Sequence, residues 1–228
     1  MGKSITDYSS VTTIGLDVAK HVFQVHCVDA SGGVVVNKSV RRSKLLEFFA
    51  SLPRSVVGLE ACGSAHHWAR ELIKLGHDAR MMPPAYVKPY VRRQKNDAAD
   101  AAAICEAVTR PSMRFVAVRS LENQATLMRH KAREVLVSQR TQLLNGLRGH
   151  LAEVGVIAPQ GPKNAGELAD RIEACDETIP IEVCEALAPL VVQLRNLDEA
   201  IARLDRTIAK LAQQDETTRQ TRRRSAKR

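Results

Sequence analysis

The sequence predicts an α/β fold built on a mixed β-sheet, followed by a long pair of helices. Two observations lead to this prediction. Between residues 11 and 82, three β-rich segments follow one another directly and two more alternate with helical segments, which is the element order of a mixed sheet. From residue 120 onward, apolar residues recur at steps of three and four, which is typical of amphipathic helices.

The α/β part begins with an antiparallel meander, because the turn at residues 29–33 contains two glycines and joins two β-rich runs. The helix expected at residues 97–108 is rich in alanine, and such a smooth surface lets a helix approach a sheet closely. The expected strands lie at residues 11–18, 22–29, 34–40, 55–60 and 78–82. The expected helices lie at residues 44–50, 63–75 and 97–108.

The helical part contains one apolar stripe over residues 121–154 and a second from Leu190 to Leu211. The second stripe has about three heptads of the spacing that coiled coils use. The two helices most simply pack as an antiparallel hairpin, although pairing with a second subunit is an open alternative. We therefore predict three regions, which are a catalytic α/β domain at 11–115, a helical coiled-coil region at 119–215 and a basic tail at 216–228.

Composition favours a polyanionic partner. Lysine and arginine outnumber aspartate and glutamate by 34 to 25, which gives a formal net charge of +9. Nucleic acid is the first expectation and an anionic membrane surface the second. As a separate point, no apolar run reaches the ~18 residues that a membrane-spanning helix needs. Aromatic residues make up only 4%, which argues against a base-stacking platform.

Five cysteines without a CxxC pair predict free thiols and a cytoplasmic location.

Four carboxylates are the candidate catalytic residues. Asp17 and Glu60 each end an apolar, β-rich run, whereas Asp97 and Asp100 lie three apart and share one helical face. Acids that converge at one end of a sheet repel one another unless cations neutralise them. Mg²⁺ prefers such oxygen ligands, and two ions ~3.5–4 Å apart can act on a phosphodiester. Taken singly, Asp17 could begin a turn, and the helical acids could simply favour a helix N-terminus.

Basic residues near these acids are candidates for nucleic-acid binding. Arg92, Arg93 and Lys95 directly precede the acidic helix, and Lys20 follows Asp17 by three residues. These cations could hold phosphates close to the metal ions. For Lys20, an ordinary solvated lysine is the alternative. His66 and His67 could contact phosphate or metal, but partly exposed helix positions are the simpler interpretation.

At these acids the sequence resembles a known family. The three segments that carry the resemblance are Gly15-Leu16-Asp17-Val18-Ala19-Lys20, Leu59-Glu60-Ala61-Cys62-Gly63 and Gln94-Lys95-Asn96-Asp97-Ala98-Ala99-Asp100-Ala101. They are similar to the DEDD-type transposases of bacterial insertion sequences, which are recombinases guided by a bridge RNA. The resemblance covers residues 11 to about 217.

The resemblance implies a ribonuclease H-like (RuvC-like) fold, two Mg²⁺ ions, and cleavage and rejoining of DNA strands. It maps the tetrad of that family onto Asp17, Glu60, Asp97 and Asp100. The implied partners are DNA and a guide RNA. From the helical seam and the apolar runs of the sequence we also expect a second copy of the chain and no membrane.

The sequence departs from the family pattern at its end. Family members continue into a second domain that contributes an attacking serine, whereas Ser225 lies in the basic tail without that context. We therefore expect a truncated or frame-shifted copy. Two alternatives to a transposase remain, which are a catalytically inactive nucleic-acid-binding remnant and a RuvC-like nuclease that uses metal-activated water.

Overall fold

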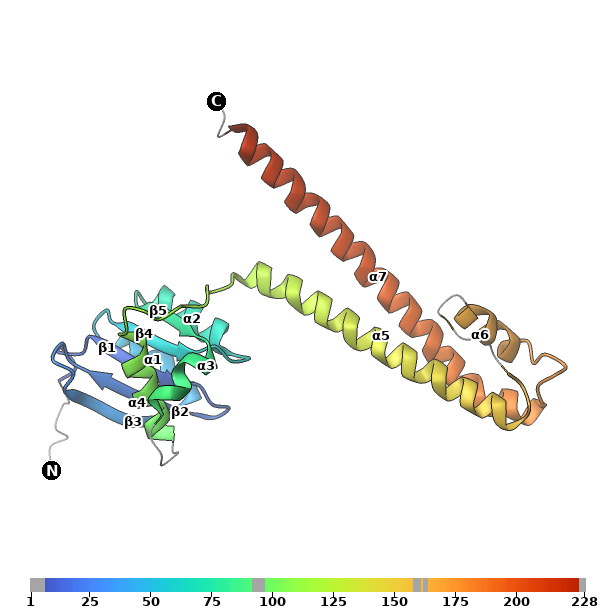
Figure 1. Cartoon of the computed structure of the whole chain (residues 1–228), viewed down its shortest axis with the longest axis horizontal. Coiled ribbons are helices and arrows are strands. Elements are labelled where there is room, and N and C mark those ends of the chain that lie inside the picture. The colour runs from blue at the N-terminus through green and yellow to red at the C-terminus, as the bar shows by residue number, and fades with distance from the viewer. Residues whose placement is uncertain (1–6, 92–96, 158–160, 162–163, 226–228) are drawn as a thin grey trace. The chain divides into compact units, whose positions relative to one another are not determined.

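Two structural units divide the chain, one from Met1 to Ser120 and one from Leu121 to Arg228 (Figure 1). The computed structural model describes residues 7–91, 97–157, 161 and 164–225. The side chains of Asp97 and of residues 215–225 lie outside this description.

The first unit contains a five-stranded mixed sheet in the order β3-β2-β1-β4-β5. The strands are β1 (Thr13–Asp17), β2 (Val22–Val28), β3 (Val34–Arg41), β4 (Val56–Glu60) and β5 (Asp78–Met82). The first three pair antiparallel, whereas β4 lies parallel to both β1 and β5. The predicted meander and mixed sheet are therefore confirmed.

Helices cover both faces of this sheet (Figure 1). They are the 3₁₀ helix η1 (Arg42–Lys44), α1 (Leu45–Ala50), α2 (Ala65–Lys74), α3 (Pro84–Val87), the 3₁₀ helix η2 (Lys88–Tyr90) and α4 (Asp97–Val108). Residues of α1 and α2, such as Phe49 and Trp68, are buried in one cluster with Ile14, Leu16 and Phe23 of the strands. The helix α4 packs on the opposite face, where Ile104 and Val108 are buried with Met82.

Two glycines allow α4 to lie directly on the sheet. Gly15 and Gly58 are register partners in β1 and β4. A Cβ atom on Gly15 would lie 2.5 Å from the Cys105 nitrogen, and one on Gly58 would lie 2.9 Å from the Cβ of Val108. No side chain fits at either position, so the approach expected from the alanine-rich sequence of α4 is confirmed.

The second unit is helical and contains α5 (Leu121–Glu153), α6 (Ala165–Glu173) and α7 (Ile181–Ser225). Arg133 of α5 pairs with Asp205 of α7, and Arg140 pairs with Asp198 at 2.6 Å. The later residue of α5 pairs with the earlier residue of α7, so α5 and α7 are antiparallel. Leu147 and Leu151 are fully buried against α6 and α7 residues that include Leu168 and Val191. Within the described residues, no helix combines the length and apolarity that a membrane crossing requires.

The apolar stripes of the long helices are buried over only part of their length. Buried stripe positions in α7 end at Leu197, and later ones such as Leu204 are half-buried. In α5, Leu121, Met128 and Val135 keep 71%, 60% and 55% of their surface exposed. The helix α7 also begins nine residues before Leu190 and continues to Ser225, through most of the predicted basic tail. The predicted helix pair is thus present, but its apolar stripes are buried over only part of their length.

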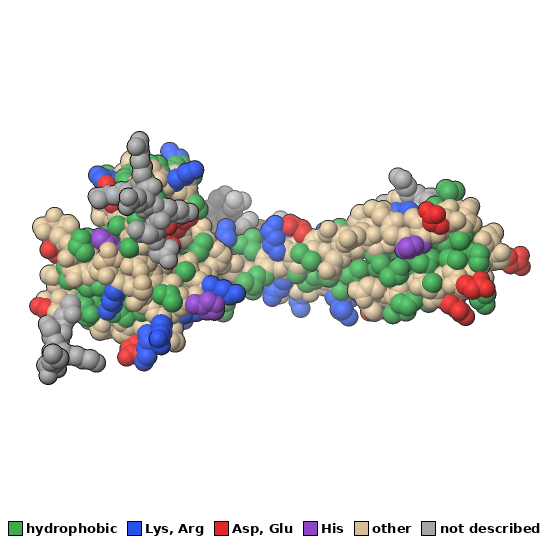
Figure 2. All heavy atoms as spheres, turned by 90° about the horizontal axis from the view of Figure 1, so that it is seen from below, with side chains coloured by type: hydrophobic (Ala, Val, Ile, Leu, Met, Phe, Trp, Pro, Cys, Tyr) green, Lys and Arg blue, Asp and Glu red, His purple; other side chains and the backbone are tan. Residues whose placement is uncertain are grey.

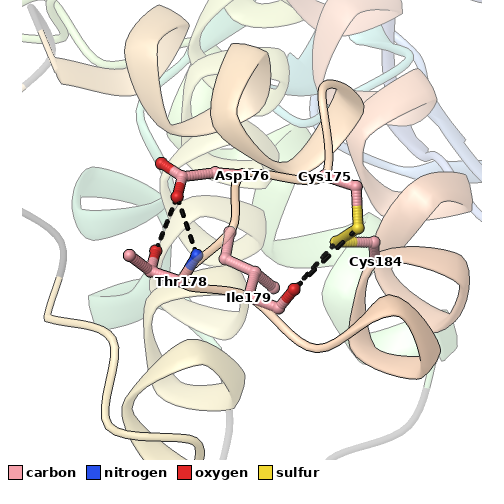
Figure 3. Close-up of a disulfide and its surroundings, with 5 residues drawn as sticks. All are labelled: Cys175, Asp176, Thr178, Ile179 and Cys184. Atoms are coloured by element: carbon pink, nitrogen blue, oxygen red, sulfur yellow. Dashed lines mark hydrogen bonds between the residues drawn. A yellow bond between two sulfur atoms is a disulfide. The ribbon is translucent and has the colours of Figure 1, made fainter.

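The prediction that all cysteines are free thiols is wrong. Cys175 and Cys184 form a disulfide between the end of α6 and the first turns of α7, with their Cα atoms 5.7 Å apart (Figure 3). Cys175 has a positive φ of 47°, and the carbonyl oxygen of Ile179 lies 3.9 Å from both sulfur atoms. The fold of this loop brings the pair together, and sequence spacing does not reveal it. Among the described residues, Cys27, Cys62 and Cys105 are free.

Candidate active site

Asp17 and Glu60 end neighbouring parallel strands. Asp17 is the last residue of β1 and Glu60 the last of β4, and the preceding residues, Leu16 and Leu59, are register partners. Because side chains alternate along a strand, both acids lie on the same face as Gly15 and Gly58, which is the face that α4 covers. Both acids are only partly buried, so water and ions can reach them.

Helix α4 carries the other two predicted acids. Asp100 directly precedes Ala101, whose carbonyl oxygen lies against Gly15 of β1. Asp97 is the first residue of α4, and its side chain lies outside the described residues. In the described part of the chain, no three histidine, cysteine or acidic side chains are grouped closely enough to hold a metal ion. The structure thus brings Asp17 and Glu60 to adjacent positions and places Asp100 on the covering helix, without joining these three in one cation site.

A polar ladder beside Asp17 was not anticipated from the sequence. Gln24 is the register partner of Asp17 and is only 9% exposed. Its amide nitrogen donates to Oδ1 of Asn37 at 2.8 Å, and its carbonyl oxygen accepts from the hydroxyl of Ser39 at 2.8 Å. Alternation of polar and apolar residues in β2 was visible in the sequence, but the partners come from β3. The ladder fixes a neutral amide next to the candidate acid.

His26 lies on the same face as Gln24, two residues further along β2. Its Nδ1 is buried and makes no hydrogen bond within the described structure. Burial lowers the pKa of its imidazole, so His26 is neutral at pH 7. Together with Asn37 and residues of α4 it lines a cavity of about 580 Å³.

The predicted nucleic-acid contacts are only partly visible. Lys20 is exposed in the turn between β1 and β2, whereas Arg92, Arg93 and Lys95 lie outside the described residues. His66 accepts a hydrogen bond at Nδ1 from the backbone nitrogen of Arg119 at 3.2 Å. Burial, and the positive charges of Arg119 and Arg70, lower the pKa of His66. This neutral acceptor joins α2 to the segment before α5, which favours a structural role for His66.

These observations define an α/β protein in which two adjacent parallel strands, β1 and β4, each end in a carboxylate on the face that an alanine-rich helix covers. A family model described as a transposase, that of the DEDD transposases of IS110 type, matches residues 14–156. This match covers more than half of the chain. The chain therefore belongs to this transposase family, as the resemblance predicted.

Curated relatives carry transposase names. The chain is 47% identical over 201 residues to a probable family 20 transposase of Pseudomonas aeruginosa, with 87% of this chain and 60% of that protein covered. It is 35% identical over 208 residues to the transposase for insertion sequence element IS1328 of Yersinia enterocolitica, covering 91% and 62%. It is 37% identical over 207 residues to the transposase for IS1111A of Coxiella burnetii, covering 90% and 57%. The chain thus spans about three fifths of the length of these relatives.

Proposed function

We propose that this chain carries the catalytic domain of a DNA transposase, acting by metal-dependent strand cleavage and transfer. The observation that carries the proposal is the adjacency of Asp17 and Glu60 on the face covered by α4, in a member of a DEDD transposase family. The strand order, with an antiparallel β2 beside a central β1, agrees with a ribonuclease H-like, RuvC-like fold. We assign catalysis to Asp17, Glu60, Asp97 and Asp100.

The donor set fits magnesium. Mg²⁺ is commonly bound through one or two carboxylates, with water and substrate phosphates completing the shell. Asp17 and Glu60 can supply those carboxylates, and Asp97 and Asp100 would extend the set to two ions. When bound, the ions would activate the attacking oxygen and stabilise the leaving oxygen. The chain's own contribution is positioning, because Gly15 and Gly58 hold α4 and its acids close to the strand ends.

The proposed partners follow from charge and surface. A net charge of +9 suits DNA and a guide RNA, with Lys20, Arg92, Arg93 and Lys95 as phosphate contacts. The exposed apolar side chains of α5 suit a second copy of the chain, with the helical region 119–215 acting as a coiled coil. The catalytic domain would then be residues 11–115, with a basic tail at 216–228. Because the proposed substrate is DNA, we propose a cytoplasmic location.

A cleavage assay tests the function. Junction DNA is incubated with Mg²⁺ and the chain, alone and with the remaining segment of a longer relative added. Asp17→Asn and Glu60→Gln should each lower the cleavage rate at least about 100-fold, because even outer-shell partners of a metal are worth 10–100-fold. Asp78→Asn is the matched control, since that carboxylate lies at the start of β5 and pairs with Arg80. Equal rates for Asp17→Asn and the wild type would reject the proposal.

A second candidate is a nucleic-acid-binding protein without catalysis. It is favoured by the net charge of +9, which attracts nucleic acid whether or not strands are cut. Salt-sensitive DNA binding without cleavage, even with the longer segment added, would support it. Cleavage by the chain alone would support the nuclease alternative.

A further inference from the structure

A run of cations at the edge of the sheet was not among the predicted sites. Lys38, Arg41, Arg42 and Lys44, here called the basic edge, lie within seven residues at the end of β3 and in η1. The strand β3 is an edge strand of the sheet. Arg41, Arg42 and Lys44 are exposed, and Lys38 is half-buried.

The basic edge lies at the end of the sheet that holds Asp17. Asp17 pairs with Gln24, Gln24 pairs with Ser39, and Arg41 follows Ser39 by two residues on the same face. Strand spacing and rise per residue put the Cα atoms of Asp17 and Arg41 about 12 Å apart. The backbone nitrogen of Arg42 also donates to the carbonyl oxygen of His21 at 2.9 Å, which joins the basic edge to the turn that carries Lys20.

The two arginines carry charge that no described acid neutralises. Several other cations of this unit are paired, such as Arg80 with Asp78 at 2.6 Å and Lys74 with Glu71 at 2.8 Å. Among ion pairs between described residues, none includes Arg41 or Arg42. Unpaired exposed arginines attract polyanions, and their planar fork of donors matches phosphate.

Aromatic rings on the other face of the sheet, which α1 and α2 cover, hold two of these cations in place. The guanidinium of Arg42 lies 4.9 Å from the ring centre of Trp68 and 5.8 Å from that of Phe23. The ammonium of Lys38 lies 3.9 Å from the ring centre of Phe48. A cation that rests on a ring loses less side-chain freedom when it binds an anion, because it is already ordered.

The surface beside β3 is concave. A cavity of about 430 Å³ is lined by Lys38, Arg41, Lys44 and the hydroxyl-bearing Ser39 and Ser51. The lining also includes Glu47, whose carboxylate pairs with Lys44 at 2.7 Å. Three cations against one acid leave the cavity positive, as a site for a phosphate chain requires.

From these observations we propose that the basic edge binds the phosphodiester backbone of the nucleic acid on which Asp17 and Glu60 act. The proposal rests on the proposed function for the identity of the substrate. Arg41, on the face that holds Asp17, would hold the strand a few nucleotides from the acids, and Arg42 and Lys38 would extend the contact around the edge strand to the other face. Contacts of this kind fix register without reading sequence. An alternative role for cations on an edge strand is to prevent pairing with other chains, and that role predicts no contribution to nucleic-acid binding.

Binding to the full chain tests the proposal without any need for cleavage. The anisotropy of a labelled short DNA duplex, and of a single-stranded RNA of equal length, is measured in EDTA between about 50 and 200 mM salt. Arg41→Gln/Arg42→Gln is compared with Lys74→Gln/Arg80→Gln, which removes the same charge from positions that acids already neutralise. The first variant should bind at least about tenfold more weakly, and its salt slope should fall by about two, because each phosphate contact contributes nearly one. The control should change affinity less than about threefold.

The outcomes of this experiment distinguish the proposed binding site from the proposed catalytic function. Equal losses in both variants would reduce the effect to net charge and overturn the proposal, as would no loss in either. A loss confined to DNA or to RNA supports it and identifies the bound strand. Arg41→Lys/Arg42→Lys keeps the charge and should retain the salt slope, which excludes misfolding as the cause. Binding is measured in EDTA and cleavage in the separate Mg²⁺ assay, so either proposal can fail alone.

Discussion

The two units of the chain differ in how tightly their helices are packed. In the sheet unit, α4 lies on β1 and β4 so closely that Gly15 and Gly58 have no room for a Cβ atom. In the helical unit, a Cβ atom on Gly146 or Gly149 of α5 would meet no atom within 4 Å beyond its chain neighbours and the adjacent backbone of its own helix. Figure 2 shows hydrophobic side chains along the surface of the helical unit. Met128 and Val135 of α5 are 60% and 55% exposed. The same residue type thus marks tight packing in one unit and open surface in the other.

Substituting glycine should produce the largest contrast between the units. Gly15→Ala places a Cβ atom 2.5 Å from the Cys105 nitrogen, and relieving the overlap means moving α4 or β1. We expect the sheet unit to lose about 3 kcal/mol, the upper part of the usual range for overpacking. Gly146→Ala should instead stabilise the helical unit by up to about 1 kcal/mol, because alanine favours a helix. Hydrogen exchange resolved by peptide measures both units in one experiment.

Equal effects of these two substitutions would show that α4 does not lie against Gly15 as described. Gly149→Ala serves as a second open position in α5 and should follow Gly146→Ala.

Reduction should act on the helical unit alone. The Cys175–Cys184 bond closes a short loop, with a sequence separation of nine. Removing such a cross-link costs about 2–3 kcal/mol in the chain-entropy description. Denaturation with and without dithiothreitol measures this loss, and the sheet unit should not respond.

Two variants control for the thiol chemistry. Cys175→Ser/Cys184→Ser should match the reduced wild type and ignore dithiothreitol. Cys62→Ser removes an exposed free thiol and should change nothing. A dithiothreitol response that persists in the double variant would assign the effect to another cysteine.

Mild acid should weaken the sheet unit first. His77 is 5% exposed, and its Nδ1 accepts from the Ser55 nitrogen at 3.3 Å, so its Nε2 carries the proton and donates to the Phe49 carbonyl. Burial lowers the pKa of His77 below that of the unfolded chain. Its contribution to stability is therefore complete above about pH 6.5 and is lost as pH falls through the folded pKa.

The helical unit should respond only at lower pH. Hydrogen bonds from Thr178, and then from Arg171, lower the pKa of Asp176 to about 2. The contribution of Asp176 is present above its ordinary value of 3.8 and is lost as pH falls toward 2. Denaturation at stepwise lower pH, with His77→Gln as the comparison, follows both units. His26 and His66 shift in the same direction as His77, so this variant should remove only part of the dependence; an unchanged profile would exclude His77 as a source.

Sequence patterns predicted those features that follow from local period. The helix α4 has the predicted bounds, because its alanines and flanking breakers are local signals. The adjacency of Asp17 and Glu60 follows from two parallel strands that end in acids. The disulfide depends on the loop between α6 and α7, and the Gln24 ladder on its register with β3, so neither was predicted. The start of α7 was missed because Pro189, which usually ends a helix, lies within it.

Trp68 gives the molecule a built-in optical reporter. It is the only tryptophan of the chain, it is 4% exposed in the core of the sheet unit, and the guanidinium of Arg42 rests on its ring. Its fluorescence therefore follows the unfolding of one unit while circular dichroism, dominated by the long helices, follows the other. Because the indole lies directly beneath a cation of the basic edge, a polyanion that draws Arg42 away should change the emission without any attached dye.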